Sequence, residues 1–410
     1  MSEVQANIVI VGGGHAAAQL CAGLVAAGQG ALVHLVSDEP ELPYQRPPLS
    51  KAFLKTATEP VQAHRPADWY ASSGISVHLG DAAVAINRAA QTVTLASGTK
   101  LPYATLVLAT GTRARRLPGL AESLENVAIL RSAADAHSLR SRLMAASAVT
   151  VLGGGFIGLE IAATAQVLGK QVTVLEAAPR LLGRSVSAEL AAHVLNTHRA
   201  AGIALQLGVA VGDFEVQGGR LMSLRVNGEP HSVDLLVLGI GAVAETALAE
   251  AAGLPCDNGI TVDAQMRTAD PHILAVGDCA NFPHAGSGRR TRLESVPNAN
   301  EQARTAVATI SGHDEPHRAL PWFWSEQGAL RLQMAGLLPT GPGTDIQTHR
   351  RPGATPASFS LLHYAGGQLV CAESANAPAD HMALRKLLET GANPAPALAC
   401  DPAVALKSLA

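Results

Sequence analysis

The sequence predicts an α/β fold with two Rossmann-like nucleotide-binding domains and a small C-terminal α+β domain with an antiparallel sheet. Two glycine-rich turns carry this prediction. The first glycine turn is Gly12-Gly13-Gly14-His15-Ala16-Ala17, and the second is Gly153-Gly154-Gly155-Phe156-Ile157-Gly158. Each follows an apolar strand-like run and opens a helix-like run. One such turn is weak evidence, but two in one chain indicate a protein that holds two dinucleotides.

The first strand–helix–strand unit lies close to the N-terminus. Residues 7–11 form a short Ile/Val run that is typical of a central parallel strand, and residues 16–27 are helix-like. A second buried strand at 31–36 completes the βαβ unit. In the second copy, the corresponding segments are residues 148–152, 156–168 and 171–175.

Three further runs have the character of buried strands, at residues 106–109, 235–240 and 273–276. A turn that contains glycine follows each of them. Ligands of a doubly wound sheet bind beyond the carboxyl ends of its strands, so these turns are candidate cofactor contacts. The turns are Thr110-Gly111, Gly241 and Gly277-Asp278.

The composition changes at about Leu320, where two of the three tryptophans occur in Pro321-Trp322-Phe323-Trp324. Alternating stretches separated by Gly and Pro follow, and a helix-like segment at 380–388 comes after them, which is the pattern of a small antiparallel domain. The alternating stretches are residues 330–335, 358–362 and 368–372. We therefore expect a first nucleotide-binding domain at 1–112 and 245–319, a second one inserted at 113–244, and a C-terminal domain at 320–410.

The composition excludes several classes of protein. The net charge of −3 gives no general attraction to nucleic acid or to an anionic membrane. The five cysteines are scattered, so a disulfide framework or a zinc site is not expected, and a reducing cytoplasm fits. Residues 4–37 lack charged side chains, but glycines and polar residues interrupt them, so we expect buried strands there and no membrane span.

An acidic residue at the end of the second strand of each unit completes the nucleotide-binding pattern. Glu176 follows the second glycine turn by about 20 positions, the spacing at which an acid binds ribose hydroxyls. Its charge should repel a 2′-phosphate, so we expect NADH to be preferred over NADPH. Arg184 lies further along and does not follow it directly. In the first unit the acid is Asp38 or Glu39.

Three stretches point to a family. They are Arg46-Pro47-Pro48-Leu49-Ser50-Lys51, Glu294-Ser295-Val296-Pro297-Asn298-Ala299 and Pro321-Trp322-Phe323-Trp324-Ser325-Glu326-Gln327. With the paired glycine turns, they resemble the FAD-dependent NADH:ferredoxin reductases that serve bacterial cytochrome P450s and Rieske-type oxygenases, the putidaredoxin reductase and biphenyl dioxygenase reductase group. The resemblance implies a glutathione-reductase-like fold with the NAD domain inserted in the FAD domain. It also implies an oxidoreductase that passes electrons from NADH through FAD to a [2Fe-2S] ferredoxin.

The resemblance further implies residue roles. Lys51 would point at flavin N5 and pair with Glu160 near the nicotinamide, where its charge would stabilise the reduced flavin. Two alternatives stay open: Lys51 as an ordinary surface lysine and Trp324 as a core anchor of the small domain. FAD would be contacted by Gly12, Gly14, Ala16, Ala17, Asp38, Glu39, Arg46, Lys51, Val84, Thr110, Gly111, Arg131, Asp278, Val296 and Trp324. NAD would be contacted by Gly153, Gly155, Ile157, Gly158, Glu160, Glu176, Arg184 and Gly241.

The cysteine positions bear on the electron acceptor. No cysteine lies between Cys21 and Cys256, so the thiol pair of the disulfide reductases is absent from its expected place. Electrons must then leave the flavin by another route, and a separate one-electron carrier is the natural acceptor. Such carriers are commonly acidic, and a basic docking face is expected. Its candidate residues are Arg289, Arg290 and Arg304, with Arg292 close by in sequence and Arg350-Arg351 as a second basic pair.

Three alternative functions are also compatible with the sequence. An NADH oxidase would pass electrons to dioxygen, a rubredoxin reductase would use another small carrier, and a redox-sensing flavoprotein would act as a binding module. The sequence contains no four-cysteine cluster, so no iron–sulfur or other metal centre is expected within the chain. The expected assembly is a monomer or a weak homodimer.

Overall fold

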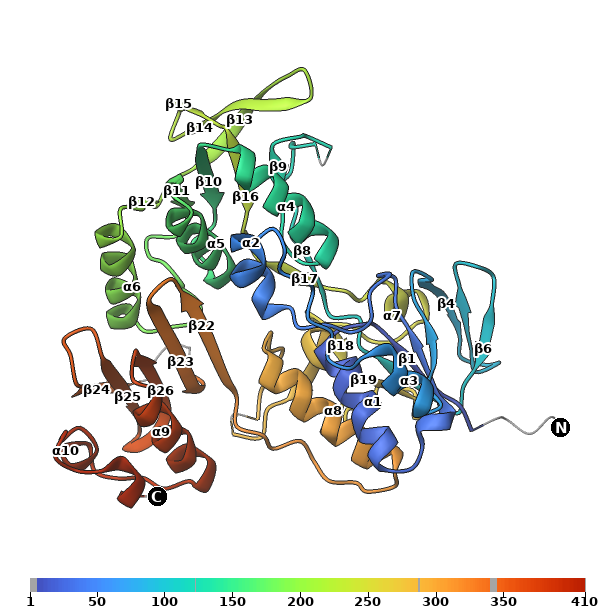
Figure 1. Ribbon diagram of the computed structural model, residues 1–410. Helices are drawn as coiled ribbons and strands as arrows, with labels where there is room; N and C mark the ends of the chain where they lie inside the picture. The colour runs from blue at the N-terminus through green and yellow to red at the C-terminus, as the bar shows by residue number, and fades with distance from the viewer. Residues whose placement is uncertain (1–5, 122, 287, 340–344, 410) are drawn as a thin grey trace. The chain divides into compact units, whose positions relative to one another are not determined.

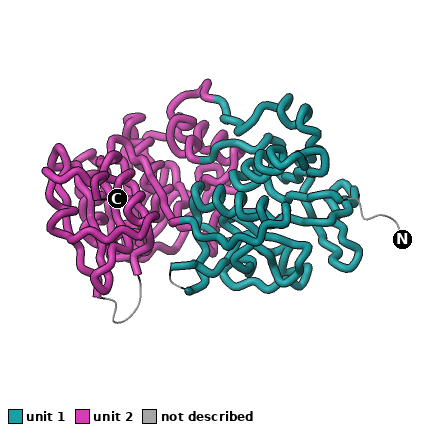
Figure 2. Tube along the Cα trace, turned by 90° about the horizontal axis from the view of Figure 1, so that it is seen from below, with its two compact units in different colours: residues 1–46, 60–113, 242–319 teal, residues 47–59, 114–241, 320–410 magenta. Residues whose placement is uncertain are grey.

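The computed structural model describes residues 6–121, 123–286, 288–339 and 345–409. Its backbone contacts divide the chain into two compact units, which Figure 2 shows in two colours. Unit 1 comprises Met1–Arg46, Pro60–Arg113 and Ala242–Ala319. Unit 2 comprises Pro47–Glu59, Ala114–Gly241 and Leu320–Ala410.

Unit 1 is built on a five-stranded parallel sheet with the order β19-β7-β1-β2-β3. Val11, the last residue of β1, is paired with both Val36 and Leu108, so three strands end at one edge of the sheet. The strands are β1 Ile8–Val11, β2 Val33–Val36, β3 Ser76–His78, β7 Thr105–Leu108 and β19 Ile273–Ala275. Helices α1 (His15–Ala26) and α8 (Val296–Ile310) pack against each other (Figure 1).

Shorter elements complete unit 1. Two three-stranded sheets have the orders β4-β5-β6 and β18-β20-β21, and β17 pairs with β8. The strands are β4 Ala83–Asn87, β5 Thr92–Leu95, β6 Lys100–Pro102, β8 Thr112–Ala114, β17 Ala242–Ala244, β18 Ile260–Thr261, β20 Ala280–Pro283 and β21 Arg290–Thr291. The helices are α3 Ala67–Ser72 and α7 Ala247–Ala251, with 3-10 turns η1 Gly30–Leu32 and η3 Gly277–Cys279.

Unit 2 repeats the Rossmann-like pattern with a parallel sheet of order β12-β11-β10-β16-β9. An antiparallel sheet, β13-β14-β15, extends from it. The strands are β9 Val127–Ala128, β10 Ala148–Leu152, β11 Gln171–Glu176, β12 Ala204–Leu207, β13 Val211–Gln217, β14 Arg220–Val226, β15 Glu229–Ser232 and β16 Leu235–Leu238. The helices are α2 Ala52–Lys55, α4 Ala133–Ala145, α5 Phe156–Val167 and α6 Ala188–Ala200, and the 3-10 turn η2 is Pro47–Ser50.

The C-terminal part of unit 2 is a five-stranded antiparallel sheet with the order β22-β23-β26-β25-β24. Its core includes Leu362 and Tyr364 on the sheet and Leu384 and Leu387 on α9. The elements are β22 Trp322–Gln327, β23 Leu330–Gly336, β24 Ile346–Pro352, β25 Phe359–Ala365, β26 Gln368–Ala375, α9 Pro378–Thr390, α10 Pro396–Ala399 and the 3-10 turn η4 Leu406–Leu409.

The predicted fold class is confirmed: two parallel Rossmann-like sheets and a C-terminal antiparallel sheet are present. Two local predictions were wrong. Residues 31–32 belong to η1, so the strand begins only at Val33. The stretch expected to alternate in β25 is continuously buried through Tyr364, because this strand lies inside the sheet and α9 contributes to the same core.

The segment Pro47–Glu59 joins unit 2, although the sequence suggested that it belongs to the first nucleotide-binding domain. Arg140 on α4 holds it, because its Nη1 donates to the carbonyl oxygens of Phe53, Thr56 and Glu59 at 3.1–3.4 Å. The Arg140 guanidinium also lies 4.3 Å from the centre of the Phe53 ring. The division into three domains remains a prediction.

Across the part of the chain that the structure describes, no helix combines the length and the apolarity needed to cross a bilayer.

Candidate functional site

The first glycine turn joins β1 to α1 at the carboxyl edge of the unit 1 sheet. Gly12 has a φ of +125°, and a Cβ at this position would lie 2.1 Å from the Ala109 carbonyl oxygen. Gly14 is the N-cap of α1 and makes no side-chain cap hydrogen bond. A Cβ on Gly14 would meet nothing within 4 Å, so the backbone here faces open space. This is the geometry of a backbone that a ligand can approach closely.

The second glycine turn has the same construction in unit 2. Gly153 has a φ of +111°, and a Cβ there would lie 2.3 Å from the Gly239 carbonyl oxygen. Gly155 is the N-cap of α5 and also lacks a side-chain cap. Two equivalent turns therefore begin two helices, one in each unit.

Three other helices begin differently. The side chains of Ser132, Ser187 and Ser295 cap α4, α6 and α8 by accepting from backbone N–H groups of the first turn. No side chain caps the N-terminus of α1 or of α5, and the helix dipole favours an anion at these positions. The two turns thus fit the pyrophosphates of two dinucleotides.

An acidic side chain accompanies each turn. In unit 2, Glu176 accepts hydrogen bonds from the N–H groups of Gly154 at 2.5 Å and Ala178 at 2.6 Å. Arg184 lies beside Gly241, with its Nη2 3.6 Å from the position of a Cβ on that glycine. The residues predicted to contact NAD in unit 2 therefore gather at the carboxyl edge of its sheet, with Ile157 exposed at the start of α5.

In unit 1, Glu39 accepts from Tyr44 Oη at 2.5 Å and from the Arg46 guanidinium at 2.6 Å. These contacts bring together two residues predicted to contact FAD, Glu39 and Arg46. Asp38 is exposed beside them. Tyr44 was missed by the sequence analysis, although it lies between the two predicted residues along the chain.

The best-defined polar cluster lies in unit 2, around Glu160 on α5. Lys51 Nζ donates to Glu160 Oε2 at 2.6 Å, and the side chains of Lys51 and Glu160 are 18% and 4% exposed. The ion pair expected from the family resemblance is therefore present, and the alternative of an ordinary surface lysine is wrong. A buried carboxylate requires such a partner, because leaving its charge unpaired would cost several kcal/mol.

Two serines that the sequence analysis did not assign complete this cluster. Ser50 Oγ donates to Glu160 Oε2 at 2.5 Å, and Ser325 Oγ donates to Glu160 Oε1 at 2.7 Å. Thr164, one turn after Glu160 on α5, donates to the Ser50 carbonyl at 2.8 Å. Ser50 and Ser325 lie in two of the stretches that carried the family resemblance, and this was the signal that could have identified them.

Other predicted contacts have the following positions. Thr110 Oγ1 donates to the Glu245 carbonyl at 2.6 Å, and Asp278 lies in the 3-10 turn η3 after β19. Val296 is the first residue of α8. Val84 is on β4 and is 56% exposed. In unit 2, the Arg131 N–H donates to Asp135, and the Trp324 ring stacks on Trp322 with centroids 5.5 Å apart.

The arginines predicted to dock a partner differ in their environments. Arg304 is 55% exposed on α8 and pairs with Glu301 one turn earlier. The guanidinium of Arg290 donates to the carbonyls of Val262 and Asn281 at 3.0 and 2.9 Å, so it is partly committed to the fold. Arg289, the residue before β21, is exposed. The prediction that Arg351 belongs to an exposed basic pair was wrong, because its side chain is buried against Asp380 and three backbone carbonyls.

The cysteines are unsuited to redox chemistry. All five are free, and three of them are buried. Burial raises the pKa of Cys21 to about 12 and that of Cys256 to about 11, so both thiols stay protonated at neutral pH. Burial also raises the pKa of Cys279, Cys371 and Cys400. Among the residues that the structure describes, no group of His, Cys, Asp and Glu could hold a metal ion.

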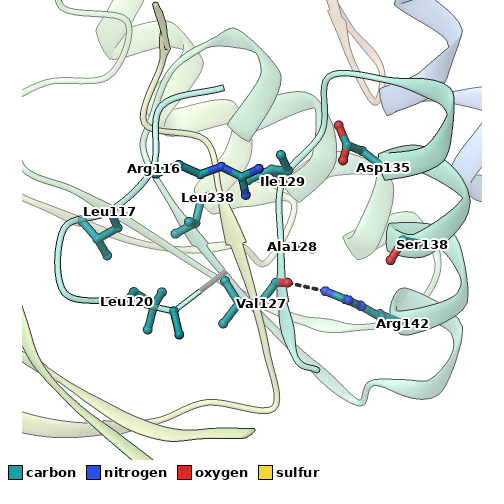
Figure 3. A pocket seen from close by; sticks show the side chains of 11 residues that line it. Arg116, Leu117, Leu120, Val127, Ala128, Ile129, Asp135, Ser138, Arg142 and Leu238 are labelled. Carbon is teal, nitrogen blue, oxygen red and sulfur yellow. Dashed lines mark hydrogen bonds between the residues drawn. The ribbon is translucent and has the colours of Figure 1, made fainter. Parts of the chain in front are cut away.

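One pocket in unit 2 lies between β9, α4 and the loop that precedes β9 (Figure 3). Its lining combines apolar side chains with charged and polar ones. The charged groups there are engaged by the protein itself: Arg142 donates to the Val127 carbonyl, and Asp135 accepts from the N–H groups of Arg131 and Ser132. The pocket is separate from the second glycine turn.

Comparison with known proteins agrees with this geometry. The family described as "Pyridine nucleotide-disulphide oxidoreductase" matches residues 6–303, and "Reductase C-terminal" matches residues 322–410. Rhodocoxin reductase of Rhodococcus erythropolis is 41% identical over 96% of this chain and 92% of its own. The anthranilate 1,2-dioxygenase system ferredoxin--NAD(+) reductase component of Burkholderia cepacia is 40% identical over 98% of each chain.

The solved structures extend this similarity to the fold. The crystal structure of the covalent putidaredoxin reductase–putidaredoxin complex aligns with a TM-score of 0.92 and 37% identity. The alignment covers 99% of this chain and 98% of that one.

Proposed function

Because this chain belongs to the pyridine nucleotide-disulphide oxidoreductase family, and is therefore an oxidoreductase that binds a flavin and a pyridine nucleotide, we propose that it is an FAD-dependent NADH:ferredoxin reductase. It would pass electrons to a [2Fe-2S] ferredoxin of a cytochrome P450 or Rieske-type oxygenase system. The names of its relatives support this acceptor, since they include ferredoxin and putidaredoxin reductases.

The observation that carries the proposal is the combination of two uncapped glycine turns with thiols that are unpaired and held protonated. The turns provide for two dinucleotides, and the cysteines supply no disulfide relay. Electrons would then leave the flavin directly, and a separate carrier is the acceptor that we propose. Bound FAD supplies the chemistry of accepting a hydride and releasing electrons singly.

We assign the cofactors to the turns as follows. The first glycine turn would bind the FAD pyrophosphate, with Glu39 and Arg46 at its ribose side and Asp278 at its ribityl chain. The second glycine turn would bind NADH, with Glu176 at the ribose and Arg184 nearby. Lys51 would stabilise negative charge on the reduced cofactor, and Glu160 would hold Lys51 in place.

Glu176 should set the preference for NADH. Replacing Glu176 with alanine should lower the ratio of kcat/KM for NADH to that for NADPH by about tenfold or more, since the carboxylate no longer repels the 2′-phosphate. Steady-state kinetics with both nucleotides measure this ratio. Glu229→Ala, at an exposed glutamate on β15, is the control and should leave the ratio unchanged. An unchanged ratio in Glu176→Ala would remove this residue from the specificity assignment.

Arg304 should contribute to ferredoxin docking. Charge reversal by Arg304→Glu should slow ferredoxin reduction by about tenfold at low salt, with a smaller effect at high salt, because exposed charges are screened. Reduction of ferricyanide by NADH should stay normal, which separates docking from chemistry. Arg225→Glu, at a similarly exposed arginine on β14, is the matched control. Equal ferredoxin rates for both variants would contradict the docking role.

A coupled assay tests the proposed function as a whole. The purified protein is mixed with NADH and a panel that contains [2Fe-2S] ferredoxins, a rubredoxin and dioxygen. The proposal requires NADH-dependent reduction of a ferredoxin at rates well above oxygen consumption. Faster reduction of rubredoxin, or NADH oxidation that needs no carrier, would favour the two alternative enzymes instead.

A further inference from the structure

Glu160 is the end of a longer chain of buried hydrogen bonds in unit 2. Ser325 Oγ lies 2.7 Å from Glu160 Oε1, and Gln327 Nε2 lies 3.2 Å from Ser325 Oγ. Gln327 Oε1 then lies 2.7 Å from His198 Nε2 on α6. The four residues of this chain of bonds are each at most 4% exposed. We call Ser325, Gln327 and His198 the donor chain.

The chemistry of the groups fixes the direction of each bond. An ionised carboxylate only accepts, so the hydroxyl of Ser325 gives its one proton to Glu160. Ser325 must then accept from the amide nitrogen of Gln327, whose oxygen is left to accept from His198. Burial lowers the pKa of His198, which favours the neutral ring. The proton is assigned to Nε2, because that nitrogen faces the Gln327 oxygen, which can only accept. Every donor in the chain therefore points toward Glu160.

The donor chain and the segment that contains Lys51 bind different oxygen atoms of the Glu160 carboxylate. Lys51 and Ser50, which are adjacent in sequence, both donate to Oε2. Ser325 donates to Oε1 from a different segment, β22 of the C-terminal sheet. The carboxylate is thus fixed in rotation by donors on both of its oxygens.

We propose that Ser325, Gln327 and His198 are positioning residues that keep Glu160 ionised and correctly oriented for its ion pair with Lys51. In this arrangement the C-terminal sheet is part of the scaffold of the reaction centre. The inference rests on the proposed function in one respect: the importance of the Lys51–Glu160 pair to flavin reduction. The effect on the charge of Glu160 itself does not depend on it.

Few other charged side chains lie on the elements that pack against α5, where they could influence the charge of Glu160. Helix α5 packs against η2, β10, β11 and β22. On these elements the titratable side chains besides Lys51, which follows η2, are Glu176 and Glu326. Glu176 is engaged by the backbone at the second glycine turn, and Glu326 pairs with Arg331 at 3.1 Å on the exposed side of β22.

The test is a pH titration of Ser325→Ala by infrared difference spectroscopy, on protein purified with its flavin and without nucleotide. Loss of a donor to the charged form raises the pKa of a carboxyl group. The carbonyl band of a protonated carboxylic acid should therefore appear at a pH about one unit or more higher in Ser325→Ala than in wild type. Adding Glu160→Gln should abolish the shifted band, which assigns it to Glu160.

Matched variants keep the result specific. Ser374→Ala removes another buried serine of the same sheet, one that bonds Ser360 and not Glu160, and should titrate as wild type does. Ser325→Thr keeps the hydroxyl and should restore the wild-type titration. Gln327→Leu, which keeps Ser325, should give a smaller shift in the same direction and serves as the second variant should Ser325→Ala fail to fold.

The outcome separates this inference from the proposed function. Wild-type titration in both Ser325→Ala and Gln327→Leu would overturn the inference, even with an active enzyme. Failure of NADH to reduce the wild-type flavin would overturn the proposed function and leave the infrared shift intact. With both correct, the pH profile of flavin reduction should move in the same direction as the infrared titration.

Discussion

Replacing Lys51 with methionine should slow the reduction of bound flavin by NADH by about two to three orders of magnitude, the usual effect of removing a group that stabilises developing charge. Methionine keeps much of the side-chain volume and removes the ammonium that pairs with Glu160. Anaerobic stopped-flow absorbance measures this rate directly. The flavin content should stay close to that of wild type, since the substitution leaves the first glycine turn, which would bind the FAD pyrophosphate, unchanged.

Two controls separate chemistry from folding. Lys55→Met, at an exposed lysine of the same segment, should react like wild type. Lys51→Met leaves Glu160 without its cation, which should lower the melting temperature. The double variant Lys51→Met/Glu160→Gln should recover that stability without recovering the rate. A wild-type rate in Lys51→Met would show that the ion pair is structural only.

Replacing Gly12 with alanine should yield protein that lacks flavin. The added Cβ would lie 2.1 Å from the Ala109 carbonyl oxygen, and the φ of +125° is one that residues with side chains rarely adopt. Either β1 and β7 move apart or the turn changes conformation, and in both cases the N–H groups at the start of α1 no longer meet the pyrophosphate together. The ratio of flavin to protein absorbance reports the loss.

Gly212→Ala is the control for this substitution, because a Cβ at Gly212 meets nothing within 4 Å and its φ is not positive. Circular dichroism distinguishes loss of flavin from loss of fold. A flavin content in Gly12→Ala that equals that of wild type would contradict the role assigned to the first glycine turn.

Much of the fold was predictable because its signals are local. Gly12 and Gly153 each indicate a positive φ and a close approach of neighbouring backbone, and the apolar runs before the two turns indicate buried parallel strands. The membership of Pro47–Glu59 in unit 2 was not predictable. It depends on Arg140, which is far away in sequence and whose contacts are with backbone carbonyls that carry no residue-specific signal.

The site was predictable to a smaller extent. The Lys51–Glu160 pair was expected from the family resemblance, but the donors around it were missed. Ser325 and Gln327 are two positions apart on a strand, so they share one face, and this spacing could have marked them as a pair. Their partners, Glu160 and His198, are brought to them only by tertiary packing. Arg290 shows the opposite case, since nothing in the sequence around it indicated that its guanidinium binds backbone carbonyls.

The central claim is that electrons pass from NADH to bound flavin and on to a one-electron carrier with no thiol between them. An anaerobic reductive titration of the purified protein tests it most directly. If flavin is the one redox centre, each chain takes up a single pair of electrons before it is fully reduced, and the reduced protein then reduces added ferredoxin. Uptake of a second pair, with new free thiols, would contradict the account.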